Sequence, residues 1–317
     1  MTWLSWRQQR TETIVAAALL ALLTVAFVPE GIQLANYFAH HHVARCINSQ
    51  TQACGFVIGN FALSAGTVGA LFDSGWFNLV PGLIGVALAV PLLLELENGT
   101  LRLAWTQSIT RGRWLASKLG FSVGTVLLAA GCFTLLLTWY QRPLARVYGR
   151  WDHFDFEWFV PIGYALFALG LALAIGVVLR RSAIALVIAF GLYVAGRVFV
   201  ESGLRKHFMT PISATFSQSS AGPNLSHAWV LSEAPSDRAG HPFVGTPGVF
   251  QNCGKVGPDG FKHLNQACMA RHGAGFTHAV YQPASRFFEF QGIETALFGG
   301  VALLLIAFAA WRVLASD

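Results

Sequence analysis

The sequence predicts an all-α membrane protein with six transmembrane helices, and three observations predict it. Hydrophobic residues make up 54% of the 317 residues and charged residues only 11%, whereas soluble domains carry about 25% charged residues. The mean hydropathy is +0.53. Six segments also reach the length of about 20 apolar residues that crosses a bilayer. The net charge of +6 is therefore no sign of a nucleic-acid partner, and we expect none.

The predicted spans are 13–38, 77–96, 119–140, 159–179, 183–200 and 293–313. The first span is unusual, because its purely apolar part ends near Val28 and Pro29 follows. Since proline disrupts helix hydrogen bonding, we expect this span to break or re-enter near Pro29.

An amphipathic segment, residues 1–12, precedes the first span. Trp3 and Trp6 lie in sequence beside Arg7 and Arg10, which is typical of a helix at the membrane interface. No small-residue cleavage site follows the first span, so we do not interpret it as a signal peptide.

Lys and Arg are dense in the short segments on one predicted side of the membrane, namely 1–12, 97–118, 180–181 and the C-terminus. This bias predicts that both termini are cytoplasmic. The other side holds loops 39–76 and 141–158 and the segment 201–291, which is too long for a simple connector. We therefore predict spans one to five within 13–200, an extracytoplasmic domain or lid at 201–291, and the sixth span with the C-terminus at 292–317.

Four of the five cysteines, Cys46, Cys54, Cys253 and Cys268, fall on the predicted outer side. An even number of cysteines in an oxidising compartment predicts two disulfides. Cys46–Cys54 with Cys253–Cys268 is the local pairing, although four cysteines allow three pairings. Free thiols remain an alternative, and the spacings do not match the usual zinc knuckles.

All ten histidines also lie on the predicted outer side. Metal binding or pH sensing is one interpretation, but histidine is also common in loops and at helix ends, and we predict no metal site. The sequence contains no GxxxxGK[ST] or HExxH motif. We therefore predict no catalytic residue and no cofactor in this chain.

Charged residues within the predicted spans are few, and two of them stand out. Glu30 lies in the outer part of the first, and we name it as a candidate for lining a translocation cleft. Arg197 lies near the outer end of the fifth, where we favour a side chain that extends to the membrane interface.

The segment Leu94–Gly120, LELENGTLRLAWTQSITRGRWLASKLG, separates the second and third spans. Asn98–Gly99 is a helix stop and Thr100 a good N-cap. We expect a short transverse helix around Leu101–Trp105 and a new helix after Thr110.

This segment resembles the loop between the second and third spans of type-2 ABC exporter permeases. The matching residues are Glu97, Gly99, Thr100, Leu101, Trp105, Thr106, Ser108, Arg111 and Lys118. Many members have a proline before the Ser/Thr-Arg step, where this chain has Gln107. MTWLSWRQQR at the N-terminus and YQPASRFFEFQGIE at 281–294 resemble the actinobacterial branch of that family.

The resemblance implies a permease subunit in the bacterial plasma membrane that exports a hydrophobic or amphiphilic substrate. It implies an ABC ATP-binding subunit in two copies, which would bind ATP and Mg²⁺, and a second permease chain, identical or related. The residues that would couple to the ATPase are Glu97, Gly99, Thr100, Leu101, Leu103, Trp105, Thr106 and Arg111. Two other functions stay open: a receptor or sensor whose outer domain binds a ligand, and a membrane enzyme, for which no nucleophile–base pattern is evident.

Overall fold

The computed structural model describes most of the chain. Outside the description lie residues 1, 48, 50, 67–68, 70–74, 99–109, 218–221, 224, 244–252, 257–261, 265, 274 and 316–317, and the side chains of residues 2–10, 12, 255–256, 262–264 and 266–267. The chain divides into two compact units. The helical unit contains residues 1–147, 152–205 and 288–317, and the smaller unit contains residues 148–151 and 206–287.

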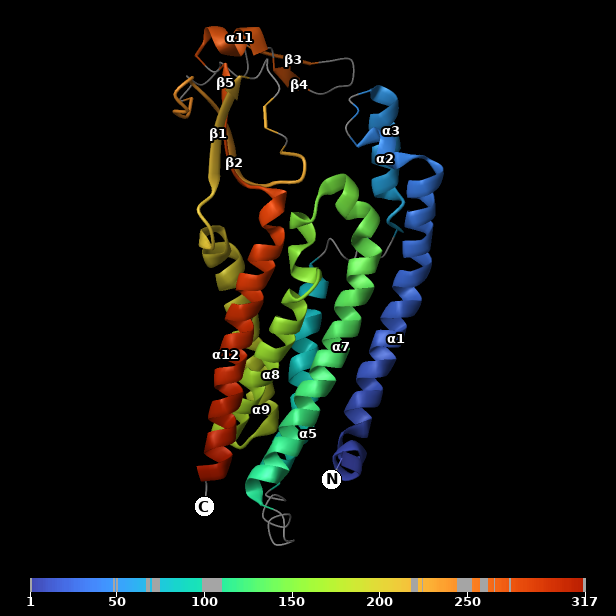
Figure 1. Ribbon diagram of the computed structural model, residues 1–317, viewed down its shortest axis with the longest axis vertical. Coiled ribbons are helices and arrows are strands. Elements are labelled where there is room, and N and C mark those ends of the chain that lie inside the picture. The colour runs from blue at the N-terminus through green and yellow to red at the C-terminus, as the bar shows by residue number, and fades with distance from the viewer. Residues whose placement is uncertain are drawn as a thin grey trace. The chain divides into compact units, whose positions relative to one another are not determined.

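Within the described part of the chain, six helices are long and apolar enough to cross a membrane, judged by length and composition. They are α1 (Thr2–His40), α5 (Val80–Glu97), α7 (Arg111–Tyr148), α8 (Val160–Leu179), α9 (Ser182–Phe199) and α12 (Phe287–Ala315). The prediction of six spans is confirmed, and each predicted span overlaps one of these helices. Both chain termini lie at the same end of the helical unit (Figure 1). We call this the terminal end, and the opposite one the distal end.

The helix α1 continues without interruption across Pro29, so the predicted break there is wrong. Packing against α7 explains the difference. Phe27 and Leu34 are buried on either side of Pro29, and a Cβ atom added to Gly31 would lie only 2.6 Å from the Trp139 side chain. Neighbouring helices commonly stabilise a proline-containing transmembrane helix in this way. Residues 2–12 form the first turns of the same helix.

The helix α8 is the most buried of the six, and α5 packs closely against it. A Cβ atom added to Gly85 of α5 would lie 2.1 Å from the carbonyl oxygen of Ala165 on α8, and one added to Gly176 would lie 2.1 Å from the Leu93 side chain. Only glycine fits at position 85, where the facing atom belongs to the backbone, whereas at position 176 a larger residue would require the Leu93 side chain to move. Such close approaches are typical of helix packing in membranes.

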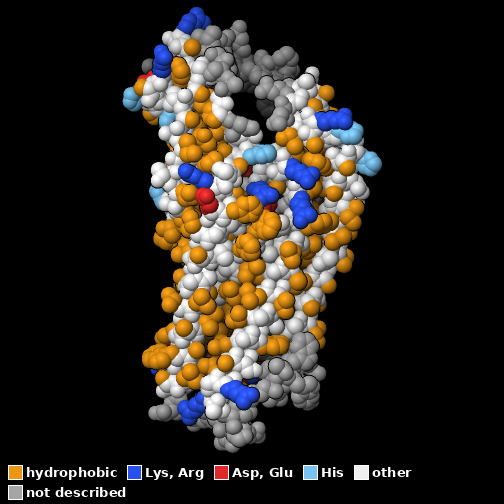
Figure 2. All heavy atoms as spheres, viewed as in Figure 1, with side chains coloured by type: hydrophobic (Ala, Val, Ile, Leu, Met, Phe, Trp, Pro, Cys, Tyr) orange, Lys and Arg blue, Asp and Glu red, His pale blue; other side chains and the backbone are white. Residues whose placement is uncertain are grey.

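Other faces of the spans are apolar and exposed. Val187 of α9 and Leu303 and Leu304 of α12 are 71–74% exposed. On the face in view in Figure 2, hydrophobic side chains cover the middle of the helices, and Lys and Arg lie above and below that band. This distribution is expected for helices surrounded by lipid.

Short helices connect the spans at the distal end. After α1 come α2 (Val43–Cys46) and α3 (Gln52–Leu63), joined by the Cys46–Cys54 disulfide. Phe61 of α3 packs on Phe38 of α1, with ring centroids 5.7 Å apart. The 3₁₀ helix η1 (Trp76–Leu79) leads into α5, and η2 (Trp151–Phe156) lies between α7 and α8. After α9 the chain continues as a π-helix, η3 (Val200–Leu204), and a 3₁₀ turn, η4 (Arg205–His207).

The smaller unit contains β-structure, which the all-α prediction does not include. The strands β1 (Ile212–Ser217), β5 (Phe276–Gln282) and β2 (Trp229–Ser236) form an antiparallel sheet in that order, with an irregularity between Val230 and Ser232. The strands β3 (Gly254–Val256) and β4 (Lys262–Leu264) form a second pair, followed by α11 (Gln266–Arg271). Trp151 stacks on Trp229 with ring centroids 5.4 Å apart. The short η5 (Ala284–Arg286) leads into α12.

Candidate functional sites

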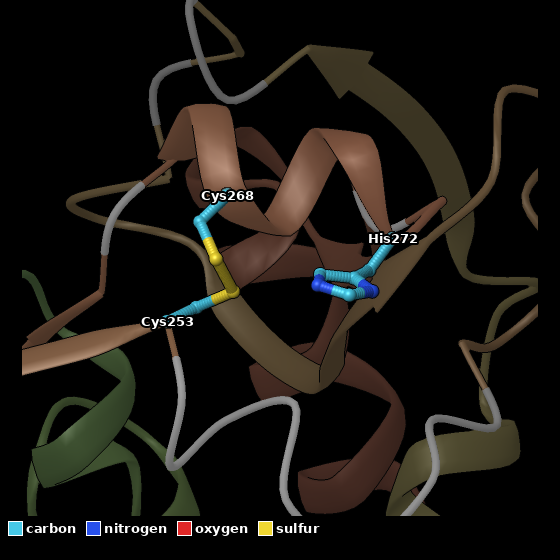
Figure 3. A group of neighbouring side chains, drawn as sticks. All are labelled: Cys253, Cys268 and His272. Atoms are coloured by element: carbon cyan, nitrogen blue, oxygen red, sulfur yellow. A yellow bond between two sulfur atoms is a disulfide. The ribbon is translucent and has the colours of Figure 1, made fainter.

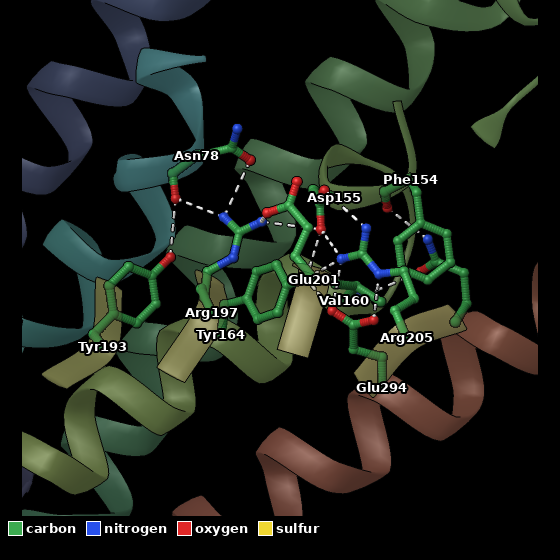
Figure 4. Close-up of polar contacts among 11 residues, drawn as sticks. Asn78, Phe154, Asp155, Val160, Tyr164, Tyr193, Arg197, Glu201, Arg205 and Glu294 are labelled. Carbon is green, nitrogen blue, oxygen red and sulfur yellow. Dashed lines mark hydrogen bonds and ion pairs between the residues drawn. The ribbon is translucent and has the colours of Figure 1, made fainter. Parts of the chain in front are cut away.

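A cluster of buried charged side chains lies at the distal end of the helical unit (Figure 4). Its ionisable members are Asp155 in η2, Arg197 in α9, Arg205 in η4 and Glu294 in α12, with the half-exposed Glu201 of η3 at its edge. The two arginines are 5% and 6% exposed and Glu294 is 1% exposed. We call these five residues the distal charge cluster.

Arg205 binds two carboxylates at once. Its Nε and Nη2 atoms donate to the two oxygens of Glu294, each at 2.8 Å. Its Nη2 and Nη1 atoms also donate to the two oxygens of Asp155, at 2.5 and 3.3 Å. The guanidinium lies over the ring of Phe154, 4.4 Å from its centroid. Bidentate arginine–carboxylate pairs have both strong hydrogen bonds and defined geometry, so Arg205 ties η2 firmly to α12.

Arg197 extends the cluster toward α5. Its Nη2 atom lies 2.9 Å from Asp155, and its Nη1 atom donates to the backbone and side-chain oxygens of Asn78, at 2.9 and 3.1 Å. The guanidinium lies 4.1 Å from the centroid of the Tyr164 ring. The predicted extension of Arg197 to the membrane interface is therefore wrong, because the side chain has an anion, a carbonyl and an aromatic face inside the protein.

The hydroxyl of Tyr164 lies between the two buried carboxylates, 2.7 Å from Asp155 and 2.5 Å from Glu294. The hydroxyl has one proton, so it donates a hydrogen bond to one of the two carboxylates at a time. Burial raises the pKa of the Asp155 carboxyl, but Arg205 and Arg197 outweigh that effect, so its pKa is lower than usual. Asp155 is therefore held as an anion between two cations.

The π-helix η3 explains how both arginines reach one cluster. An α-helix turns about 100° per residue, so side chains eight positions apart diverge by about 80°. A π-helix has more residues in each turn, and η3 occupies five of the positions between Arg197 and Arg205. The wider turn reduces the divergence and brings the two guanidinium groups to the same side.

The charges of the cluster nearly balance, because two guanidinium groups face two buried carboxylates and one half-exposed one. A nearly neutral cluster of this kind holds segments of the protein together. The segments joined here are η1, η2, α8, α9 with η3 and η4 that continue it, and α12. Sequence analysis named Arg197 but missed Asp155, Arg205 and Glu294. The available signal was an acidic residue, Glu294, inside the predicted sixth span.

The predicted coupling segment falls mainly outside the described residues, which is where Gly99, Thr100, Leu101, Leu103, Trp105 and Thr106 lie. Its two ends are described. The helix α5 ends at Glu97 with Asn98 as its C-cap, at the predicted helix stop. The helix α7 begins at Arg111, which is exposed.

Both ends of this segment are tied to other helices. The Oε2 atom of Glu97 accepts hydrogen bonds from the backbone N–H of Ser182, at 2.9 Å, and from its hydroxyl. Ser182 is the first residue of α9, where the helix dipole favours an anion. Near the start of α7, the buried Lys118 forms an ion pair with Glu95 of α5 at 2.5 Å. A force on the coupling segment would therefore reach α5, α7 and α9 directly.

Glu30, the predicted cleft-lining residue, is partly buried on α1. It lies close to Gly66, since a Cβ atom added there would be 2.7 Å from its Oε2 atom. Gly66 also has a φ of 66°, so both space and backbone conformation favour glycine at this position.

Both disulfides have the local pairing, Cys46–Cys54 and Cys253–Cys268. His272 lies beside the second pair, within 4.8 Å of both sulfur atoms (Figure 3). Metal ions bind thiolates, and in this disulfide the two sulfurs are bonded to each other. In this form His272 is the one member of this group of three that still offers a metal ligand. Cys132, on α7, is the remaining cysteine and is free.

Comparison with known protein families gives a match. A family model described as "ABC-2 membrane transporter related" matches residues 17–205, a range that begins in α1 and ends at Arg205 of the distal charge cluster. A search of the curated proteins returns no match, and neither does a search of the solved structures.

Proposed function

Because this chain belongs to the ABC-2 membrane transporter related family, we propose that it is the permease subunit of an ATP-driven exporter for a hydrophobic or amphiphilic substrate. It is a multi-pass membrane protein with six spans and a transporter permease by family. Energy would come from a separate ABC subunit in two copies, which binds ATP and Mg²⁺. A second permease chain, identical or related, would complete the transporter in the bacterial plasma membrane. The observation that carries this proposal is the family match over 17–205.

In this proposal the terminal end faces the cytoplasm and receives the ATPase. The density of Lys and Arg in the short segments there supports this orientation. The ATPase would contact the coupling segment around Leu101–Thr106. The contacts of Glu97 with Ser182 and of Glu95 with Lys118 would then transmit the movement to α9 and α7.

In this mechanism the distal charge cluster prevents movement of the helices relative to one another, whereas the terminal end is displaced. It would hold the distal ends of α8, α9 and α12 together, so that these helices move as one rigid body when the terminal end is displaced. ATP can drive such a movement only if the two conformations of the permease bind the ATPase with different affinities.

Co-purification tests the proposal. The tagged chain is purified from the membranes of cells that encode it, and co-purifying proteins are identified by mass spectrometry and assayed for ATP hydrolysis. We expect an ABC ATPase with the unchanged chain and its loss with Leu103→Asp or Trp105→Asp, because a charge at the contact must be desolvated. Val230→Asp, the same kind of change on the exposed surface of β2, is the matched control.

If no nucleotide-binding protein accompanies the chain, or if a kinase does, the exporter proposal fails and the receptor alternative gains support. If the ATPase is present but insensitive to both substitutions, the coupling segment is assigned to the wrong residues.

A further inference from the structure

A small apolar cavity lies between α1, α5 and α7 in the helical unit. Its volume is about 140 Å³, close to the roughly 150 Å³ of an engineered apolar cavity in another protein that binds benzene. Leu88 of α5 and Ala129 and Cys132 of α7 line it, and Ala16 and Ala17 are among the residues that α1 contributes. It belongs to neither of the functional sites described above.

The cavity follows from the residues along one face of α1. Leu20, Phe27 and Leu34 recur every seven positions, the spacing that keeps one face of a helix against its neighbour. Phe27 and Leu34 are 1% and 0% exposed. One heptad before Leu20 the same face continues with Thr13 and two alanines, so large buried side chains give way to small ones.

The facing surface of α7 changes in the same direction. Tyr140 packs on Phe27 with ring centroids 5.1 Å apart, whereas about two turns earlier α7 presents Cys132 and Ala129 to the cavity. Small residues usually let transmembrane helices approach closely. Here the two small surfaces stay apart and leave a space, which suggests that another group fills it.

The lining is suited to hydrocarbon. None of its residues is acidic or basic. The hydroxyl of Thr125 donates to the carbonyl oxygens of Phe121 and Ser122 on its own helix, at 3.0 and 2.9 Å, so it needs no partner from the cavity. A bound polar group would lose its hydration at this place, and the Thr125 hydroxyl, whose proton already bonds the helix backbone, could not donate to it.

The cavity lies near the midpoints of α5 and α7. Leu88 is the ninth of the 18 residues of α5, and Ala129 is the nineteenth of the 38 residues of α7. Leu128, also part of the lining, is 71% exposed. Since the hydrocarbon layer is about 30 Å thick, an opening at mid-helix faces the region where the ends of acyl chains lie.

We propose that this cavity binds the end of an acyl chain from a bilayer phospholipid. The bilayer supplies such chains in excess, which favours occupancy by mass action. The headgroup stays about 15 Å away, at the membrane surface. An acyl chain in this position fills the space between α1 and α7 along the half of α1 nearer the N-terminus. The inference depends on the six spans, not on the ATPase or on the exported substrate.

Photocrosslinking in liposomes tests this inference on the chain alone. Two phospholipids are compared, one with a diazirine at the end of an acyl chain and one with it beside the headgroup. After illumination, adducts are located by mass spectrometry. We expect the chain-end probe to label α1 at 13–20 and α7 at 125–132 several-fold more than Leu303 and Leu304, which are exposed at the middle of α12. The headgroup probe should not label these segments.

The variant Ala129→Phe fills the cavity and should reduce the α1 adducts several-fold while labelling at Leu303 and Leu304 stays unchanged. Leu135→Phe, on an exposed face of α7, is the matched control and should keep the wild-type pattern. Equal labelling of the cavity and of α12 in the wild-type chain would overturn the proposal without any variant. Displacement by traces of a free single-chain amphiphile, but not by excess phospholipid, would overturn it in favour of a different occupant.

Discussion

The two ends of the helical unit hold their helices together in different ways. At the distal end, Arg205 and Arg197 are buried and share Asp155. At the terminal end, the contact between Glu97 and Ser182 is exposed. Breaking a buried ion pair leaves one charge without a partner and shielded from water, which costs much free energy. When an exposed contact breaks, water hydrates both groups, so the cost is small. The distal ends of α8, α9 and α12 are therefore strongly fixed, and at the terminal end the contact between α5 and α9 can shift more easily.

This asymmetry suits a permease that is moved from one end. If the ATPase acts at the terminal end, as proposed, the exposed contact between Glu97 and Ser182 lies where the movement begins. The buried contacts of the distal charge cluster lie where α8, α9 and α12 must keep their relative positions. The Lys118–Glu95 pair at the terminal end is as buried as the Arg197–Asp155 pair, because the side-chain exposures are 4% and 15% in the first and 6% and 13% in the second. It would keep α5 and α7 together while the contact of α5 with α9 changes.

The largest expected effect comes from breaking the distal charge cluster. Glu294→Gln removes the anion that Arg205 binds in bidentate fashion. Loss of one partner from a buried pair typically costs about 3–5 kcal/mol, so we expect a clear fall in the unfolding temperature of the purified protein in detergent. Thermal unfolding followed by circular dichroism measures it.

Glu289→Gln is the matched control for that prediction, since Glu289 is exposed in the first turn of the same helix. It should leave the unfolding temperature nearly unchanged. Equal effects of the two substitutions would mean that the buried position of Glu294 does not matter, and the contrast between the two ends would be lost.

The helices could be predicted from sequence because hydrophobic length determines a span, and length is a local property. Their ends were less predictable. The helix α7 extends to Tyr148, eight residues beyond the predicted span, because polar residues can continue a helix outside the hydrocarbon layer. Pro29 misled the prediction because packing of α1 on Trp139 is a tertiary effect that the local sequence does not contain.

The distal charge cluster was harder to predict, because its members are far apart in sequence. Arg205 and Glu294 are separated by 89 positions, and single residues such as Arg197 resemble ordinary interfacial arginines. The π-helix η3, which aligns the two arginines, left no signal that we recognised. The disulfides were easier, because cysteines eight and fifteen positions apart on one predicted side favour local pairing.

An intermediate effect is expected from Arg205→Lys, which keeps the charge but loses the planar, forked geometry. A lysine cannot bind both oxygens of Glu294 and both oxygens of Asp155 as the guanidinium does. Hydrogen bonds to charged groups contribute about 1.5–3 kcal/mol, so we expect destabilisation on that scale, smaller than for Glu294→Gln. Arg312→Lys, at an exposed position near the C-terminus, is the control. An unaltered stability of Arg205→Lys would show that charge alone, without bidentate geometry, holds the distal end.

The smallest effect on stability is expected at the terminal end, with Glu97→Gln. The glutamine oxygen can still accept the hydrogen bonds of Ser182, but the charge that favours the start of α9 is lost. We expect the amide of Ser182 to exchange hydrogen with water faster, as measured by hydrogen–deuterium exchange of the peptide that contains it, while the unfolding temperature stays close to that of the wild type. Exposed substitutions usually change stability little. If Glu97→Gln instead lowered the unfolding temperature as much as Glu294→Gln, the terminal contacts would be as rigid as the distal ones, and movement of the permease would have to begin elsewhere.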